Sequence, residues 1–182
     1  MTKIRPALLK ALMLLCSLIF AIGFKCRAQP TEYQIKAAFI YNFARFVEWP
    51  PAAFADTNSP MIIGVLGQNV FGNVLAQTIS GKTVKGHPLE FEVFKSAAEA
   101  TKCHVLFISS SEKTRLSKIL GQLQSSNILT VGDEMDNFIT DGGMINLRIV
   151  DDKVRFEINN EAAKKADLII SSKLLRLAIN TP

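Results

Sequence analysis

The sequence has few cysteines and no hydrophobic run long enough to cross a bilayer. Its 182 residues include three cysteines, too few for a small fold that depends on several disulfides. No apolar stretch reaches the roughly 18 to 20 residues that a membrane-spanning helix needs. Charged residues make up 20% and hydrophobic residues 48% of the chain, which argues against global disorder. The length predicts one domain, or at most a small pair.

Acidic residues are missing from the first 28 positions. The chain opens with three basic residues, and residues 11–24 are all apolar or small. This stretch suits the core of a signal peptide, and small residues stand where signal peptidase would cut after Ala28. We therefore predict a signal peptide over 1–28, a mature domain over 29–182 and export to the periplasm. An uncleaved N-terminal anchor is the alternative.

The excess of positive charge lies in the same leader. The formal net charge is +5, which by itself indicates a nucleic-acid partner or an anionic membrane surface. Five of the 21 basic residues and none of the 16 acidic residues lie in residues 1–28. The predicted mature domain is therefore neutral, and we expect no nucleic-acid partner.

Cleavage would leave Cys103 as the only cysteine of the mature chain. A lone thiol in an oxidising compartment is either buried or available for pairing with another molecule. Cys103 precedes the apolar stretch Val105–Ile108, and reduced cysteine packs as a small hydrophobe. Burial is the favoured interpretation, and we expect no disulfide within the mature chain.

The mature chain begins with an amphipathic helix. Thr31 and Gln34 have the spacing of a capping box, and apolar residues then follow at helical spacing. We expect Trp49–Pro51 to end the helix, since proline disfavours helix at the preceding residue. Three charged residues lie mostly off the apolar stripe: Lys36, Arg45 and Glu48.

Short apolar strands then alternate with helices. Strands are predicted at 61–66, 89–94, 105–108, 127–131 and 168–170, and helices near 71–78, 112–124 and 172–178. Three acidic residues are interpreted as capping and solvating a short helix: Asp133, Glu134 and Asp136. Buried strands separated by helices predict an α/β fold. We expect a single-domain layered αβα sandwich with a largely parallel sheet plus a β-hairpin.

The β-hairpin is predicted over residues 144–158, the most regular part of the sequence. Two segments of alternating polarity flank Asp151 and Asp152, which form a two-residue turn. Pairing Val150 with Lys153 makes one face of the hairpin wholly apolar, and this fixes the register.

This register places Arg148 directly opposite Arg155 on the polar face. Like charges at that spacing repel each other unless something neutralises them. Guanidinium groups suit oxyanions, so we predict that the pair binds a phosphate or carboxylate ligand. Neutralisation by Glu157 and nearby acidic residues is the alternative.

No catalytic pattern stands out. Residues 81–83 are similar to the end of a phosphate-binding loop, but Ala76 stands where that loop needs glycine. Residues 109–111 lack the glycines of a nucleophile elbow and are interpreted as a helix N-cap. Cys103 and His104 would need two further metal ligands from elsewhere. We expect neither enzyme activity nor a metal site.

The end of the first helix offers a candidate interaction surface. Exposed aromatic and arginine residues are what binding hot spots prefer. We therefore predict that Tyr41, Arg45, Glu48 and Trp49 bind a partner. The alternative for Trp49 is that it fills the edge of the core.

Segments spread over the mature chain carry a family resemblance. They are Tyr33–Pro51, Val65–Gly67 with Phe71–Gly72, Gly81–Val84, Cys103–Ser109, Gly142–Leu147, Val154–Asn159 and Ser171–Ala178. Together, in this order and after a signal peptide, they resemble the YfiR family of exported bacterial proteins. The resemblance covers nearly all of the mature chain.

The resemblance implies regulation rather than catalysis. YfiR-like proteins are periplasmic repressors that bind the sensor domain of an inner-membrane diguanylate cyclase and hold it inactive. An outer-membrane lipoprotein can sequester the repressor, after which cyclic di-GMP and biofilm formation rise. The resemblance also implies an α/β sandwich, members that can be homodimeric and no cofactor. The alternative function is a small-anion-binding component of another envelope sensor, with the arginine pair as its site, and a hydrolase is a distant third.

The chain departs from the family at Gly64. Members often carry a cysteine at this position that can pair with the one at Cys103. Here that intramolecular disulfide cannot form, which puts redox control in doubt. Such a crosslink contributes about 2–4 kcal/mol, which packing must supply instead.

Overall fold

The computed structural model describes residues 31–124 and 126–179, and the predicted signal peptide lies outside them. The elements are α2 (Glu32–Phe46), β1 (Val47–Glu48), η1 (Pro51–Ala53), β2 (Met61–Leu66), α3 (Val74–Ile79), β3 (Thr83–Val84), β4 (His87–Phe94), η2 (Glu99–Lys102), β5 (Val105–Ile108), η3 (Ser110–Arg115), α4 (Leu116–Leu123), β6 (Leu129–Asp133), β7 (Ile145–Val150), β8 (Lys153–Ile158), α5 (Asn160–Lys165), β9 (Ile169–Ile170) and α6 (Ser172–Leu175). Over these ranges, no helix has the length and apolar character needed to cross a bilayer.

Seven strands form one sheet in the order β3-β4-β2-β5-β6-β7-β8, and β1 and β9 form a separate antiparallel pair. The strands from β4 to β7 run parallel, whereas β3 and β8 pair antiparallel at the two edges. Nearly every residue of β2 and β5 is buried, as expected of strands covered on both faces. The predicted parallel sheet with an added hairpin is confirmed.

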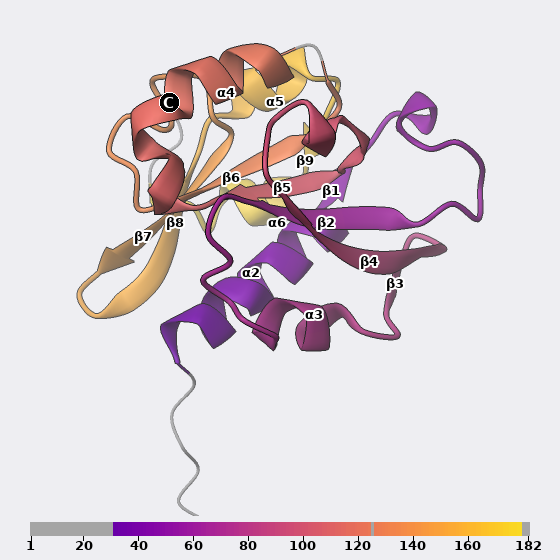
Figure 1. The fold of residues 1–182 in the computed structure, drawn as a ribbon, viewed down its shortest axis with the longest axis horizontal. Coiled ribbons are helices and arrows are strands. Elements are labelled where there is room, and N and C mark those ends of the chain that lie inside the picture. Colours follow the sequence, from indigo (N-terminus) through magenta and orange to yellow (C-terminus); the bar gives the residue numbers. More distant parts are fainter. Residues whose placement is uncertain (1–30, 125, 180–182) are drawn as a thin grey trace, which may run out of the picture. The chain divides into compact units, whose positions relative to one another are not determined.

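Helices cover both faces of this sheet. Val105 and Phe107 of β5 pack in the same apolar cluster as α2, α3 and α6. Leu106 and Ile108 of the same strand pack with α4 in a second cluster, because successive side chains of a strand point to opposite faces. Figure 1 shows α2 and α3 on one side of the sheet and α4 on the other. The predicted αβα layering of a single domain is therefore confirmed.

The hairpin has the predicted register. Val150 pairs with Lys153, and Arg148 pairs with Arg155. Asp151 and Asp152 both have positive φ, at 49° and 56°, as a two-residue type I′ turn requires.

Two helices differ from their predictions at one end. The capping box at Thr31 and Gln34 is present, but α2 ends at Phe46, ahead of the prolines. The chain leaves the helix there because β1 pairs with β9, so the expectation that Trp49–Pro51 ends the helix is wrong. The predicted helix over 112–124 begins as the 3-10 turn η3 and becomes α-helical only in α4.

Candidate partner-binding surface

The last turns of α2 carry a cluster of aromatic and cationic side chains. Arg45 is exposed and lies one turn after Tyr41, with its guanidinium carbon 5.7 Å from the centre of the Tyr41 ring. Lys82, which follows α3, places its ammonium 4.3 Å from the same ring. Cations above an aromatic face are attracted by its quadrupole. The predicted residues Tyr41 and Arg45 thus share one surface with a lysine that was not predicted to belong to it.

Trp49 is partly buried and held from both sides. Its ring packs against the main core, and its indole N–H donates a hydrogen bond to the carbonyl of Asn127 at 3.0 Å. The ring also lines a surface pocket. Both interpretations of Trp49 therefore describe part of its environment, because one portion packs inward and another faces the pocket.

Glu48 lies beside the same pocket and is exposed. Its carboxylate is 3.6 Å from the ammonium of Lys85, and Lys85 also donates to the carbonyl of Val47 at 3.2 Å. The turn before β4 is thereby tied to β1, and Lys85 lines the pocket together with Trp49.

The pocket has a volume of about 420 Å³ and a mainly apolar lining. We call it the Trp49 pocket. It lies where β2 begins, opposite the carboxyl ends of the parallel strands. Its lining residues are Trp49, Pro51, Phe54, Ala55, Asp56, Thr57, Met61, Lys85 and His87. Aromatic and apolar walls with a few polar groups are typical of a surface that receives a partner side chain or a small ligand.

Three stacked rings support one wall of the Trp49 pocket. Phe54 stacks on His87, with ring centres 3.8 Å apart, and on His104, with ring centres 4.5 Å apart. His87 is also hydrogen-bonded through Nδ1 to the carbonyl of Ser59 at 2.8 Å. The loop after η1 is thus held against β4 and β5 by ring contacts.

His104 is fixed in its neutral form. Its Nδ1 accepts a hydrogen bond from the backbone N–H of Ile62 at 3.0 Å, so Nε2 carries the proton and donates to the carbonyl of Ala53 at 3.0 Å. Burial lowers the pKa of His104 below its ordinary value, because the charged form is poorly solvated there. A cation at this position would also lose the Nδ1 acceptor.

Sequence reasoning did not identify Phe54, Lys85 or His87 as pocket residues. They come from a loop and a turn, where periodicity carries no information. The sequence Gly86-His87-Pro88 indicates chain reversal rather than a binding role.

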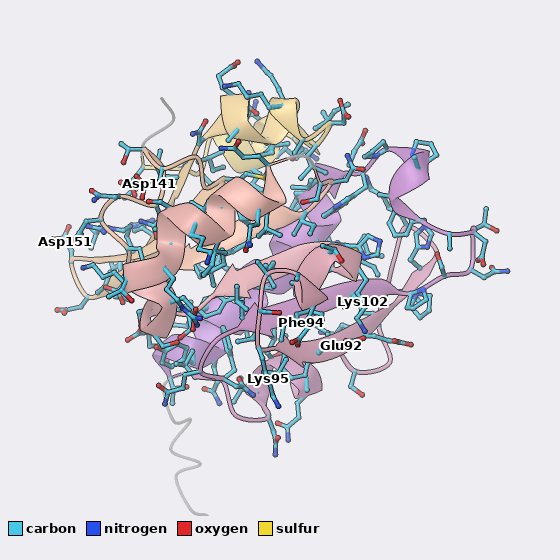
Figure 2. The ribbon with its side chains drawn as sticks, turned by 45° about the horizontal axis from the view of Figure 1, so that its top comes forward. Glu92, Phe94, Lys95, Lys102, Asp141 and Asp151 are labelled. Carbon is cyan, nitrogen blue, oxygen red and sulfur yellow. The ribbon has the colours of Figure 1, made fainter. Side chains whose placement is uncertain are left out.

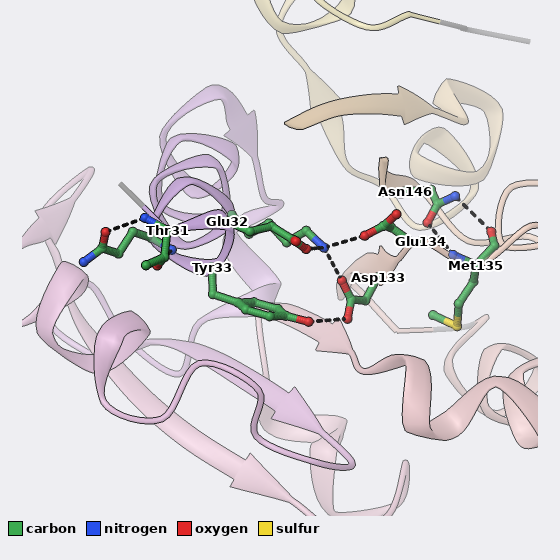
Figure 3. Close-up of polar contacts among 9 residues, drawn as sticks. Thr31, Glu32, Tyr33, Asp133, Glu134, Met135 and Asn146 are labelled. Carbon is green, nitrogen blue, oxygen red and sulfur yellow. Dashed lines mark hydrogen bonds and ion pairs between the residues drawn. The ribbon is translucent and has the colours of Figure 1, made fainter. Parts of the chain in front are cut away.

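The opposite end of α2 is held by a buried ion cluster (Figure 3). Lys36 is fully buried, and its ammonium contacts Asp133 at 2.7 Å, Glu134 at 3.1 Å and also Glu32. The Tyr33 hydroxyl donates to the other oxygen of Asp133 at 3.4 Å. The interpretation of Asp133 and Glu134 as residues that cap and solvate a short helix is wrong, because Asp133 is the buried last residue of β6.

Burial and charge oppose each other at Lys36. Burial alone lowers the pKa of its ammonium, but hydrogen bonds to Asp133 and Glu32 outweigh that effect and raise the pKa above its ordinary value. The carboxylate oxygens of Glu32, Asp133 and Glu134 lie within 4.8 Å of one another, a spacing that suits a cation. Lys36 already supplies the positive charge at their centre, so the cluster fastens α2 to the sheet.

The predicted arginine pair lies on the hairpin, away from the residues that line the Trp49 pocket. Arg148 donates to Asp136 at 3.1 Å, and hydrogen bonding to Arg148 lowers the pKa of Asp136. Glu157 accepts from Asn146 at 3.2 Å. Asp136, in the loop after β6, is therefore one of the nearby acidic residues that neutralise Arg148, and Arg155 is exposed.

Comparison with known proteins assigns the chain to a family. The model of a family described as YfiR/HmsC-like matches residues 33–179. The chain belongs to the YfiR/HmsC-like family. A solved structure of a conserved domain protein from Vibrio cholerae O1 biovar El Tor has the same fold, with a TM-score of 0.58 and 12% sequence identity. The match covers 84% of this chain and 60% of that one, and no curated protein matches.

Gly64 of β2 lies directly beside the sulfur of Cys103. A Cβ atom at Gly64 would lie 2.9 Å from the Cys103 sulfur and 2.4 Å from a ring carbon of Phe94. Position 64, where the family resemblance led us to expect a second cysteine, is therefore adjacent to Cys103. In this chain the ring of Phe94 fills the space that a side chain at position 64 would need.

Cys103 is buried and free. Its sulfur lies 2.8 Å from the carbonyl of Val105, and burial raises the pKa of the thiol to about 12. Since the thiolate is the reactive form, this cysteine is chemically inert while the domain is folded. Its environment matches the favoured interpretation, that it packs as a small hydrophobe.

Proposed function

We propose that this protein is a periplasmic regulator that binds the sensor domain of an inner-membrane diguanylate cyclase and holds the enzyme inactive. The observation that carries the proposal is the family match, which spans residues 33–179. Repression of the cyclase would lower cyclic di-GMP and limit biofilm formation. Release of the cyclase by an outer-membrane lipoprotein, which would sequester the repressor, is the second part of the proposal.

The Trp49 pocket and the adjacent Tyr41–Arg45 surface are the proposed contact with the cyclase sensor. The pocket combines an indole ring, apolar walls and a lysine. Tryptophan, tyrosine and arginine are enriched at the energetic centres of protein interfaces. A regulator that acts by binding needs such a surface and no catalytic group.

Cyclic di-GMP in the bacterium that carries this gene tests the function. Deletion of the gene is expected to raise cyclic di-GMP, and the wild-type gene is expected to restore the original level. An unchanged level after deletion would contradict the proposed function.

Charge-reversed variants then test the surface separately. Lys85→Glu places a second carboxylate beside Glu48 and is expected to abolish complementation. Lys153→Glu, at the exposed hairpin turn, is the matched control and is expected to complement fully. If Lys85→Glu also complements, the function stands and the proposed contact surface is wrong.

A small-anion-binding component of another envelope sensor is the second candidate. Its support is the juxtaposition of Arg148 and Arg155 in the hairpin. The ion pair between Arg148 and Asp136 weakens that support, since the site is already partly neutralised. Under this function, replacing both arginines by Gln would abolish signalling, whereas under the first it would leave repression intact.

A further inference from the structure

The strand order creates a crevice at the carboxyl ends of β2 and β5. β2 pairs in parallel with β4 on one side and with β5 on the other. The chain leaves β2 toward α3, which packs on one face of the sheet, and leaves β5 toward α4, which packs on the other. Open α/β sheets bind their ligands beside such a point, where successive connections diverge. The Trp49 pocket lies at the opposite edge.

A second pocket opens at this edge, on the face covered by α4. We call it the switch-point pocket. Its walls are the end of β2 at Leu66, the loop over 95–98 after β4, and side chains of η3 and α4. Its volume is about 190 Å³, room for roughly six water molecules. That is below the about 300 Å³ at which drug-sized ligand pockets begin, so the pocket suits a small ion rather than a nucleotide.

Three cations and one carboxylate line the switch-point pocket. The cations are Lys95, Arg115 and Lys118, and the carboxylate is Glu112. Glu112 forms an ion pair with Arg115. Within residues 31–124 and 126–179, no carboxylate lies in ion-pair range of Lys95 or Lys118. The pocket therefore carries an uncompensated excess of two positive charges.

The excess of positive charge is confined to the pocket, because the neighbouring Lys102 is neutralised by a carboxylate. Lys102 pairs with Glu92 at 2.7 Å, and both lie near Lys95 and Phe94 in Figure 2. Glu99 follows the pocket loop and accepts a hydrogen bond from the backbone N–H of Lys95 at 3.2 Å. The ammonium of Lys95 does not take part in this contact. Cations facing one cavity repel each other unless an anion lies between them.

The pocket wall that carries Arg115 is formed where the loop after β2 packs on η3. Gly67 has a φ of 90°, and a Cβ there would lie 2.6 Å from the Ser111 hydroxyl and 2.7 Å from Glu112. Without a side chain, the loop after β2 packs directly on η3, and Gln68 donates its N–H to Ser111 at 3.0 Å. Glu112 is buried by this contact, and it orients Arg115. Arginine has five N–H donors in a rigid fork, so donors beyond those facing Glu112 can serve a ligand.

We infer that the switch-point pocket binds a phosphate group, held by the ammonium groups of Lys95 and Lys118 and the oriented guanidinium of Arg115. The charge excess sets the sign of the ligand, and the volume limits it to a small oxyanion. The source is either free inorganic phosphate or the phosphate of a small monoester. This inference is independent of the proposed cyclase partner, because it uses none of the residues of the Trp49 pocket.

Titration of the purified protein with inorganic phosphate, followed by amide NMR, tests the inference. Saturable shifts are expected at residues 95–98 and 115–118. Lys95→Gln with Lys118→Gln removes two charge-assisted contacts and is expected to weaken binding by about 10- to 100-fold. These lysines are exposed, so the double variant keeps the fold, as an unchanged thermal melt will verify.

A matched control and a second ligand complete the experiment. Lys153→Gln with Lys173→Gln removes two exposed lysines outside the pocket and is expected to leave the affinity unchanged. Glycerol 3-phosphate that binds tighter than inorganic phosphate identifies a monoester as the source, and equal or weaker binding identifies free phosphate. Shifts that do not saturate, or equal affinity in the pocket and control variants, would overturn the inference.

Discussion

The two ends of α2 are attached to the domain in opposite ways. At its beginning, buried Lys36 is surrounded by carboxylates from its own helix and from the end of β6. At its end, Trp49 and its neighbours leave ring surfaces open to a pocket, and Arg45 and Glu48 are exposed. Charge that is buried fixes a helix in place, whereas charge and aromatic surface left in solvent are available to a partner. One end is therefore structural, and the other is the candidate for recognition.

Removal of the buried charge is expected to have the largest effect. Lys36→Met leaves Asp133 buried without its cation, and breaking a buried ion pair in this way destabilises a protein by about 3–5 kcal/mol. Arg45→Met, on the same helix but exposed, is the control and is expected to change stability by less than about 0.5 kcal/mol. Urea denaturation measures both values, and similar losses in the two variants would end the distinction between the two ends.

A double variant sharpens the same point. Lys36→Met combined with Asp133→Leu removes both partners and leaves an apolar contact, which is often near neutral for stability. We expect the double variant to recover much of the loss seen in Lys36→Met. If the double variant is no more stable than Lys36→Met, the ion pairs of Lys36 with Glu32 and Glu134 also contribute to stability.

At the pocket end, the Trp49 hydrogen bond gives a smaller effect. Trp49→Phe keeps an aromatic ring but loses the N–H that donates to Asn127. A bond of this kind contributes about 0.5–1.5 kcal/mol, and loss of that order is expected in the free energy of unfolding. An unaltered free energy would show that the hydrogen bond to Asn127 does not contribute to stability.

Acid is expected to weaken the pocket end first. The pKa of His104 in the folded protein is below its ordinary value, so the unfolded chain binds more protons just below about pH 6.5. Stability therefore falls as the pH drops below that value, and the loss levels off once the lower folded pKa is passed. The Lys36 ammonium keeps its charge throughout, because its pKa is raised. An NMR titration that places His104 at or above its ordinary pKa would refute this.

Charge reversal at the exposed end is expected to have the smallest effect on stability. Arg45→Glu should weaken binding of the proposed cyclase sensor while the circular dichroism melt stays nearly unchanged, because Arg45 is exposed and its contacts are a long hydrogen bond to Asn42 and distant ring contacts with Tyr41 and Phe46, at 5.7 and 5.8 Å. A lowered melt with full binding would assign Arg45 to structure instead.

The sequence predicts the elements better than it predicts what joins them. The hairpin register follows from a two-residue period and a turn, both of which are local. The Lys36 cluster joins residues 97 positions apart, and periodicity placed Lys36 off the apolar stripe without showing that it is buried. Of the residues that line the Trp49 pocket, the sequence pattern singled out Trp49, which follows a helix, whereas Phe54 lies in a loop and His87 follows a turn. The prediction that Cys103 is buried is confirmed, and it rested on the apolar strand that follows this residue.

The packing of Phe94 over Gly64 has a consequence for how the protein can be handled. Between positions 64 and 103 this domain relies on the Phe94 ring and an un-ionised thiol, neither of which responds to glutathione or dithiothreitol. Its folding is therefore expected to be the same in a reducing cytoplasm as in the cell envelope. Production of residues 29–182 in ordinary expression hosts is therefore expected to need no oxidative refolding.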